Sequence, residues 1–210
     1  MIDTLIASFV TLFVIIDPIG VTPMFVSLTA NESAEARRRI AVRGTVIAGV
    51  ILFAFALGGE PFLRALGIGL PAFRIAGGIL LMLLAIDMVM VRHSGMRVTT
   101  ASEQDESSHR ADVSIFPLAI PLIAGPGALT SIVLLMSEAQ GDWALQGATL
   151  VVLLIVLLIM LVFLLIAAQL VRALGQTGVN VLTRVFGMIT AALAVQFVID
   201  GLLQVWPRGS

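Results

Sequence analysis

Hydrophobic residues in this chain fall into six long runs, separated by shorter polar or glycine-rich stretches. A helix needs about 17 to 25 mostly apolar residues to cross a membrane, and each run is of that order. The runs cover residues 4–29, 40–58, 70–91, 113–137, 144–171 and 180–203, and the only long polar stretch is 92–112. The pattern therefore predicts an all-α, polytopic membrane protein with six transmembrane helices, in which residues 1–210 form a single integral membrane domain.

The chain also repeats one element of its sequence. The run from Phe13 to Thr22 aligns with the run from Pro121 to Thr130, 108 positions further on, and both interrupt an apolar segment with proline and glycine. Division at the polar stretch gives one repeat of about 4–91 and a second of about 113–203. Each repeat has three spans, an odd number, so the second must enter the membrane from the opposite side. We therefore predict two inverted three-helix repeats in which the first and fourth helices are broken.

Arginine, which supplies all twelve basic residues, predicts the orientation of these spans. Nine arginines lie in the segments 31–43, 92–112 and 172–184, and three lie on the other side. Basic residues concentrate on the cytoplasmic side of membrane proteins. The three arginine-rich segments are therefore predicted to be cytoplasmic and both chain termini periplasmic.

The composition also indicates that most of the protein surface is in contact with lipid. The chain is 59% hydrophobic and 12% charged, with a mean hydropathy of +1.10. A soluble domain is about a quarter charged, so there is too little polar surface here to cover a water-facing globule. The absence of cysteine excludes disulfides and thiolate metal sites. The N-terminus lacks a basic region before its apolar run, so we expect no removable signal peptide.

The two proline-glycine breaks form the candidate functional site. A proline inside a helix removes a backbone donor and costs about 3 kcal/mol or more. In a membrane, the resulting irregular backbone persists only where protein buries it or where it faces a cavity. Asp17-Pro18 and Gly125-Pro126 each have the sequence of a cap followed by the first residue of a new half-helix. Thr22-Pro23 offers a competing start for the first half-helix.

The start of a helix presents unpaired N–H groups and about half a positive charge. Asp17 offsets that charge at the first start, whereas Gly125 leaves it in place at the second. This asymmetry favours a carboxylate at one start and an ammonium group or a proton at the other. The predicted substrate-binding residues are Asp17, Pro18, Gly20, Thr22, Gly125, Pro126, Gly127, Ala128 and Thr130. Asp17 is also the candidate for ion coupling.

Less specific interpretations stay open for the same residues. Each break can be a kink at a packed helix interface, and Asp17 can be only a cap. The hydroxyls of Thr22 and Thr130 can bond carbonyls one turn earlier in their own helices. Glycines at 77, 78 and 187 are expected to allow close helix packing.

Charged residues near the ends of spans three and six have alternatives too. Arg74 and Arg184 begin these spans, and the favoured interpretation is that they anchor the helices by reaching the lipid headgroups. Asp87 and Asp200 lie in the last turns, where they are either proton relays or solvated acids. Gln196, one turn before Asp200, is placed to line a cavity.

No motif for nucleophilic, metal-dependent or nucleotide chemistry occurs in the sequence. HExxH, GxSxG and Walker-type patterns are all missing, so we predict no catalytic or metal-binding residues, no cofactor and no enzymatic activity. Without a nucleotide-binding domain, active transport would have to use an ion gradient.

Two phrases closely resemble those of the MarC family, which is also described as a family of six-span neutral amino acid transporters. The phrases run from Ile16 to Phe25 and from Pro117 to Ala128, and Arg-Ile-Ala-Gly-Gly at 74–78 also fits the family. The resemblance extends over about 3–204. Val21 departs from the family pattern, which has a small polar residue, often asparagine, at this position.

The resemblance implies a multi-pass protein of the inner membrane that transports small neutral amino acids such as glycine and alanine, coupled to protons. The expected partners are therefore a small neutral amino acid, a proton or a sodium ion, and the lipid bilayer, with no nucleic acid. A channel or exporter for another small solute and a non-transporting membrane protein are the alternative functions. The exact substrate, the direction of transport and whether the protein forms a homo-oligomer stay open.

Overall fold

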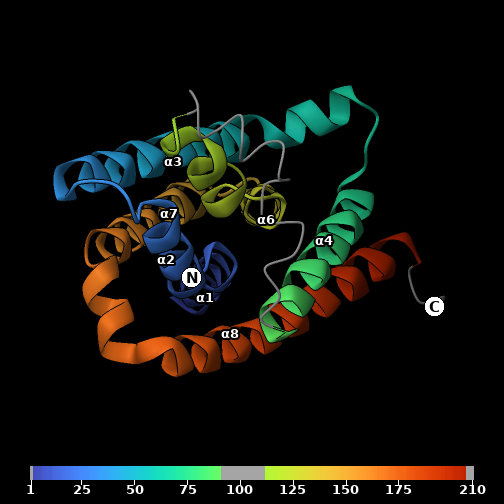
Figure 1. The fold of residues 1–210 in the computed structure, drawn as a ribbon. Helices are drawn as coiled ribbons and strands as arrows, with labels where there is room; N and C mark the ends of the chain where they lie inside the picture. Colours follow the sequence, from blue (N-terminus) through green and yellow to red (C-terminus); the bar gives the residue numbers. More distant parts are fainter. Residues whose placement is uncertain (1, 91–111, 207–210) are drawn as a thin grey trace.

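The computed structural model describes residues 2–90 and 112–206, and every element within these ranges is helical. Figure 1 shows their arrangement. The helices are α1 (Ile2–Ile16), α2 (Pro18–Leu28), α3 (Ala34–Ala65), α4 (Leu70–Met90), η1 (Ser114–Ile123), α6 (Pro126–Glu138), α7 (Trp143–Leu165) and α8 (Ala167–Val205).

The helices confirm the predicted polytopic membrane fold. Five helical segments of the described chain are long and apolar enough to cross a membrane: Ile2–Leu28, Ala34–Ala65, Leu70–Met90, Trp143–Leu165 and Thr177–Val205. The bent pair of η1 and α6 makes a sixth if it is counted as one span. The inverted relation between the two halves stays a prediction.

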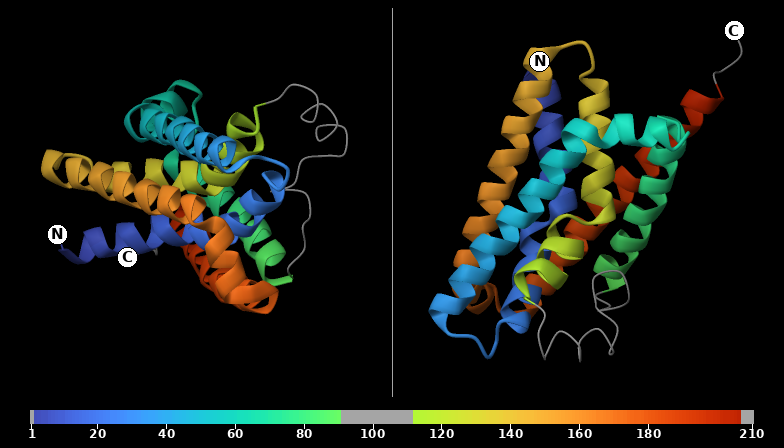
Figure 2. Two further views of the ribbon diagram at one scale, coloured as in Figure 1. Left: turned by 60° about the vertical axis from the view of Figure 1, so that its left-hand side comes forward. Right: turned by 90° about the horizontal axis from the view of Figure 1, so that it is seen from above.

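The helices run between two ends of the molecule. At one end α1 begins and α8 finishes, and we call it the terminal end (Figure 2). At the opposite end α3 begins at Ala34 and carries Arg37, Arg38 and Arg39 in its first two turns, and we call it the arginine end. Arg64 lies in the last turn of α3 at the terminal end. Four other arginines used in the orientation argument, Arg92, Arg97, Arg110 and Arg208, lie outside the described residues.

Several predicted boundaries are wrong. The fifth span was expected at 144–171, but α7 ends at Leu165. α3 was expected at 40–58 but continues through Gly58 and Gly59 to Ala65. Gly59 does not end the helix, because it is a packing position: a Cβ atom added there would overlap the side chain of Val133 on α6. The predicted loop 172–184 is helical and belongs to α8, and it is broken only at Gly175, where φ is 64°.

α4 and α8 pack closely against each other, as the glycines predicted. A Cβ at Gly78 would come within 2.8 Å of the Ala194 carbonyl oxygen, and one at Gly187 within 2.8 Å of Met88 Cβ. Gly201 makes a similar approach to the carbonyl oxygen of Pro71. Small residues let membrane helices approach to backbone contact, so α4 and α8 form one tightly packed pair.

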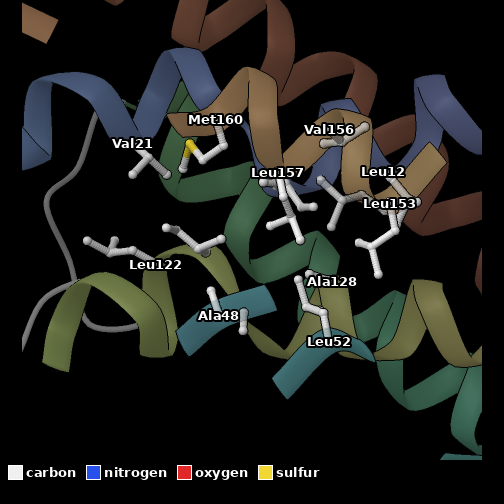
Figure 3. Close-up of a cluster of buried hydrophobic side chains, with 14 of the residues drawn as sticks. Leu12, Val21, Ala48, Leu52, Leu122, Ala128, Leu153, Val156, Leu157 and Met160 are labelled. Carbon is white, nitrogen blue, oxygen red and sulfur yellow. The ribbon is translucent and has the colours of Figure 1, made fainter. Parts of the chain in front are cut away.

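The broken helices lie in the interior of the bundle. Most side chains of the buried core come from α1, α2, α3, η1, α6 and α7, and Leu81 of α4 and Ala194 of α8 also belong to it; part of this core is drawn in Figure 3. Val21 packs in this core near Met160 of α7 (Figure 3). Large apolar side chains such as Val46, Val50 and Leu57 face outward from α3, as expected for a surface in contact with lipid.

Candidate functional site

Asp17 interrupts the first span. Its backbone has φ 53° and ψ 65°, the left-handed conformation, and it caps α2 by accepting a hydrogen bond from Gly20 N–H at 2.9 Å. The side chain is buried, and a Cβ at Gly20 would overlap its carboxylate. The predicted start at Asp17-Pro18 is therefore confirmed. The competing start at Thr22-Pro23 is wrong, because Pro23 lies inside α2.

This first break changes the helix path little. Asp17 N–H donates to the Phe13 carbonyl at 3.0 Å, and Val21 N–H donates to the Asp17 carbonyl at 3.0 Å. Regular hydrogen bonds thus flank the single left-handed residue. As a result α1 and α2 together form one span of 27 residues.

The second break is sharper. η1 carries Pro117 and Pro121, and the residues before them, Phe116 and Ile120, have extended backbone angles. α6 begins after Gly125, which has no side chain to cap it, and its axis is bent by 56° from that of η1. A Cβ at position 125 would lie 2.6 Å from the Pro121 carbonyl oxygen, so the turn requires glycine. The predicted start at Gly125-Pro126 is confirmed.

A small pocket of about 30 Å³ adjoins the start of α6. Its lining is mostly apolar and comes from α1, α4, η1 and α6: Ile15, Leu80, Leu84, Pro121, Leu122, Ile123, Gly125, Pro126, Gly127 and Ala128. Four of the predicted site residues, Gly125 to Ala128, therefore lie together on one pocket.

The other predicted residues do not line this pocket. Asp17, Pro18, Gly20 and Thr22 are buried where α2 begins. The last turn of α1 connects the two regions, because Ile15 lines the pocket and packs against Gly127, where a Cβ would lie 3.3 Å from Ile15 Cγ2. Only one of the two half-helix starts thus opens onto the pocket.

The electrostatic character of the pocket comes from the backbone of α6. The first N–H groups of a helix have no partner within it, and the helix dipole adds partial positive charge there. None of the lining residues is acidic or basic. Pro126 has no N–H, so the donors of this first turn are Gly127 and Ala128, and both line the pocket. The pocket therefore lies beside two backbone donors and the positive end of the α6 dipole, in an apolar surrounding.

Both threonines of the predicted site bond their own helices. Thr22 Oγ1 donates to the Pro18 carbonyl at 2.6 Å, and Thr130 Oγ1 donates to the Pro126 carbonyl at 2.9 Å. Thr130 also packs into the notch at Gly77 of α4, where a Cβ would come within 2.7 Å of Thr130 Cβ. The structure thus favours the local interpretation of these hydroxyls.

At the terminal end, the structure contradicts the interpretation of Arg74 as a headgroup anchor. Arg74 is only 8% exposed, and its guanidinium forms an ion pair with Glu138 of α6. A second acid, Asp200 of α8, lies 3.9 Å from Arg74 Nη1 and accepts a hydrogen bond from Gln196 at 2.7 Å. Gln196 therefore bonds Asp200 and is not among the pocket-lining residues.

Sequence reasoning missed Glu60 at the same end. This residue of α3 is also 8% exposed, pairs with Arg64 in its own helix and accepts a hydrogen bond from Gln140 at 2.8 Å. An acid inside a long apolar helix was the available signal, but Gly58-Gly59 had suggested that the span ended before it.

Asp112 holds the beginning of η1 at the arginine end. Its Oδ1 accepts hydrogen bonds from the Ser114 hydroxyl at 2.5 Å and the Ser114 N–H at 3.1 Å, and Arg43 of α3 pairs with its other oxygen. The Ser114 hydroxyl contributes most to lowering the pKa of Asp112 below its ordinary value of 3.8, with Arg43 adding to the effect.

Among the remaining predicted residues, Arg184 is exposed and Asp87 is half-buried in the last turn of α4. Within residues 2–90 and 112–206, no three histidine, aspartate or glutamate side chains are grouped so that they could hold a metal ion.

Long apolar helices, two of them interrupted in the protein interior, define a polytopic α-helical integral membrane protein with a pocket at a half-helix start. The model of the MarC family, described as integral membrane proteins, matches residues 2–206. The chain therefore belongs to the MarC family.

Relatives of similar length occur in archaea and bacteria. A UPF0056 membrane protein of Archaeoglobus fulgidus is 38% identical over 199 residues, which cover 94% of this chain and 92% of the relative. The membrane protein YhcE of Escherichia coli is 33% identical, with 95% and 92% covered. The membrane protein YvbG of Bacillus subtilis is 31% identical, with 99% and 98% covered. No solved structure matches the chain.

Proposed function

We propose that this protein is a secondary transporter of small neutral amino acids in the inner membrane, coupled to protons, that works by alternating access around its two broken helices. The observation that carries the proposal is the difference between the two breaks. α6 begins without a side-chain cap on a pocket, whereas α2 begins with a buried acid. Half-helix starts near the midplane are how many secondary transporters bind their substrates.

The substrate carboxylate is assigned to the start of α6. Backbone N–H groups at a helix start are well suited to an anion, and Gly125 supplies no negative charge to compete with it. Gly127 and Ala128 leave little side-chain bulk around this position. These features favour a ligand with a carboxylate and a small side chain, as in glycine or alanine.

Asp17 is assigned to the coupling proton or to the ammonium group of the substrate. Ionisable residues inside membrane spans are costly and commonly functional. The last turn of α1 connects Asp17 to the pocket through Ile15, so movement of α6 against α1 would change the surroundings of both.

The described conformation is taken as a closed state. The pocket, at about 30 Å³, is small, because a single water molecule already needs about 10–15 Å³ of cavity volume. An amino acid would need η1 and α6 to move away from α1 and α4. The arginine end is assigned to the cytoplasm and the terminal end to the periplasm, and no enzymatic activity is proposed.

Uptake of labelled glycine and alanine into proteoliposomes tests the assignment of Asp17. Asp17→Asn should abolish accumulation driven by a proton gradient while the protein stays folded. Asp142→Asn is the matched control, because Asp142 also caps a helix, accepting from Leu145 N–H at 3.0 Å, but does so at the surface. Full gradient-driven accumulation by Asp17→Asn would contradict the coupling role.

Substrate binding tests the pocket separately. Gly127→Leu should prevent binding of glycine, because even a Cβ at Gly127 would overlap the side chain of Leu81. Gly147→Leu is the control, since a Cβ at Gly147 has nothing within 4 Å. Unchanged binding by Gly127→Leu would place the site elsewhere. Uptake without saturation would favour a channel, and failure of all twenty amino acids to bind would favour a non-transporting protein.

A further inference from the structure

The end of α6 that lies farthest from the pocket is held on two sides by charged and polar groups. Glu138, the last residue of α6, pairs with Arg74 of α4. Gln140, two residues later, donates to Glu60 Oε2 of α3 at 2.8 Å. α6 packs against both α3 and α4 (Figure 1), so these contacts join the end of α6 to each neighbour.

Both neighbours contribute a buried charge to these contacts. Glu60 and Arg74 are each 8% exposed. Removing a charge from water is costly unless a partner compensates it, and an arginine in a protein does not escape the cost by losing its proton. Each of these residues therefore requires a partner in every conformation that the protein adopts.

Each buried charge has a second partner that does not belong to α6. Arg74 lies 3.9 Å from Asp200 on α8, and α8 is tightly packed against α4. Glu60 pairs with Arg64, one turn later in α3. If α6 moved away, neither Arg74 nor Glu60 would be left without an opposite charge.

The partners on the α6 side are suited to release. The Glu138 side chain is 58% exposed, and Gln140 is an exposed, uncharged residue. Water can therefore solvate both after they separate from Arg74 and Glu60. Arg74 Nε is moreover buried without a hydrogen-bond partner among the described residues, so the closed arrangement is incompletely satisfied. A donor left unsatisfied weakens a buried polar contact.

We infer that these contacts form a releasable clamp, made of Glu60, Arg74, Glu138, Gln140 and Asp200, that closes the terminal end of the bundle by holding α6. The break at Gly125 is the hinge at the opposite end of this 13-residue helix. Release of Glu138 and Gln140 lets α6 tilt away from α3 and α4, while Arg64 and Asp200 keep the buried charges paired. This inference rests on the proposed function, since it supplies the closed gate of an alternating-access cycle.

A single introduced cysteine can report the opening, because the chain contains no cysteine of its own. Ser131 is buried in α6 between the clamp and the pocket, so Ser131→Cys should react slowly with a membrane-impermeant methanethiosulfonate reagent. Adding Glu138→Gln should raise the reaction rate at least about tenfold, the change in an equilibrium that about 1.4 kcal/mol produces. Arg74 retains Asp200 in this variant, so the protein should stay folded.

Two controls distinguish opening from general loosening. Glu35→Gln removes an exposed ion pair with Arg39 within α3, 3.5 Å apart, and should leave the rate unchanged. Ala48→Cys, in the core on α3, should stay unreactive with or without Glu138→Gln. The clamp is overturned if Glu138→Gln leaves Ser131→Cys unreactive, or if it makes the Ala48→Cys reporter equally reactive.

No substrate is needed for this measurement, so it is independent of the transport assay. A tenfold response in a protein that binds no amino acid would support the clamp and reject the proposed substrate. If the protein takes up amino acids normally but Glu138→Gln does not change the reaction rate of the Ser131→Cys reporter, the transporter is supported and the clamp is rejected.

Discussion

Substitutions of Asp17 should separate two contributions to the free energy of unfolding: the cost of its left-handed backbone and the gain from its capping hydrogen bond. Asn tolerates the left-handed conformation and caps helices as well as Asp does, so Asp17→Asn should keep most of the stability. Gly adopts φ 53° without strain and costs only a few tenths of a kcal/mol as a cap. Asp17→Ala loses the bond to Gly20, worth about 0.5–2 kcal/mol, and adopts the left-handed conformation at a cost of about 1–2 kcal/mol. We expect Asp17→Ala to be destabilised by about 1.5–4 kcal/mol.

Asp142 provides the matched control for the capping term. It caps α7 through Leu145 N–H at 3.0 Å, but its φ of −117° is extended and suits any residue. Asp142→Ala should therefore lose only the cap, about 0.5–2 kcal/mol. Asp17→Ala should therefore lose about 1–2 kcal/mol more in free energy of unfolding than Asp142→Ala, and this difference measures the cost of the left-handed backbone at position 17.

Reversible unfolding in detergent micelles, followed by circular dichroism, measures these free energies. The expected order of decreasing stability at position 17 is Asn, then Gly, then Ala. Equal losses for Asp17→Gly and Asp17→Ala would refute the assignment of a backbone cost to this residue. If the alanine variants at 17 and 142 unfold alike, the left-handed conformation does not contribute measurably.

Three further predictions concern packing, topology and acid stability. Gly77→Ala should destabilise the protein by about 1–3 kcal/mol through overpacking against α6, whereas Gly147→Ala, in open space, should not; melting temperatures compare the two. Trp143 and Trp206, the only tryptophans, are exposed near the terminal end, so a water-soluble quencher applied to one side of oriented proteoliposomes should quench both or neither. Quenching of one from each side would contradict the crossing pattern. The pKa of Asp112 is lowered in the folded protein, so ionised Asp112 stabilises the fold at pH values above the ordinary pKa of 3.8. This stabilisation is lost as the pH falls further. Asp112→Asn should therefore lose less stability than the unsubstituted protein when the pH is lowered below 3.8 in unfolding experiments.

Hydropathy and proline positions were sufficient to predict the apolar membrane helices and both breaks, but not every helix end. An apolar segment of this length has few alternatives to a membrane helix, and proline restricts the backbone locally, without reference to distant residues. For that reason the helix starts at Asp17-Pro18 and Gly125-Pro126 were predicted to the residue.

The errors arose where the outcome depends on which helices are neighbours. Gly59 could have ended α3, but α6 places Val133 over it, and the helix continues. Arg74 could have reached the headgroups, but it pairs with acids that are distant in the sequence. Glu138 is 64 positions away and Asp200 is farther along the chain, and both come close to Arg74 only when α4, α6 and α8 pack together. A single sequence gives the residue types of such contacts but not their partners.

The two breaks resemble each other in sequence, yet their physical roles differ because only one contains its own cap. Asp17 bonds Gly20 within the protein, and the first span stays nearly continuous. Gly125 leaves the start of α6 without a side-chain cap, and the 56° bend places that start on a pocket. The arrangement cannot be reversed by exchanging the two residues, because any side chain at 125 would strike the Pro121 carbonyl oxygen at 2.6 Å. A helix start without an internal cap leaves its N–H groups for an external partner. We therefore expect the ligand to bind at α6, and Asp17, at the neighbouring break, to hold the coupling proton or the ammonium group of the ligand.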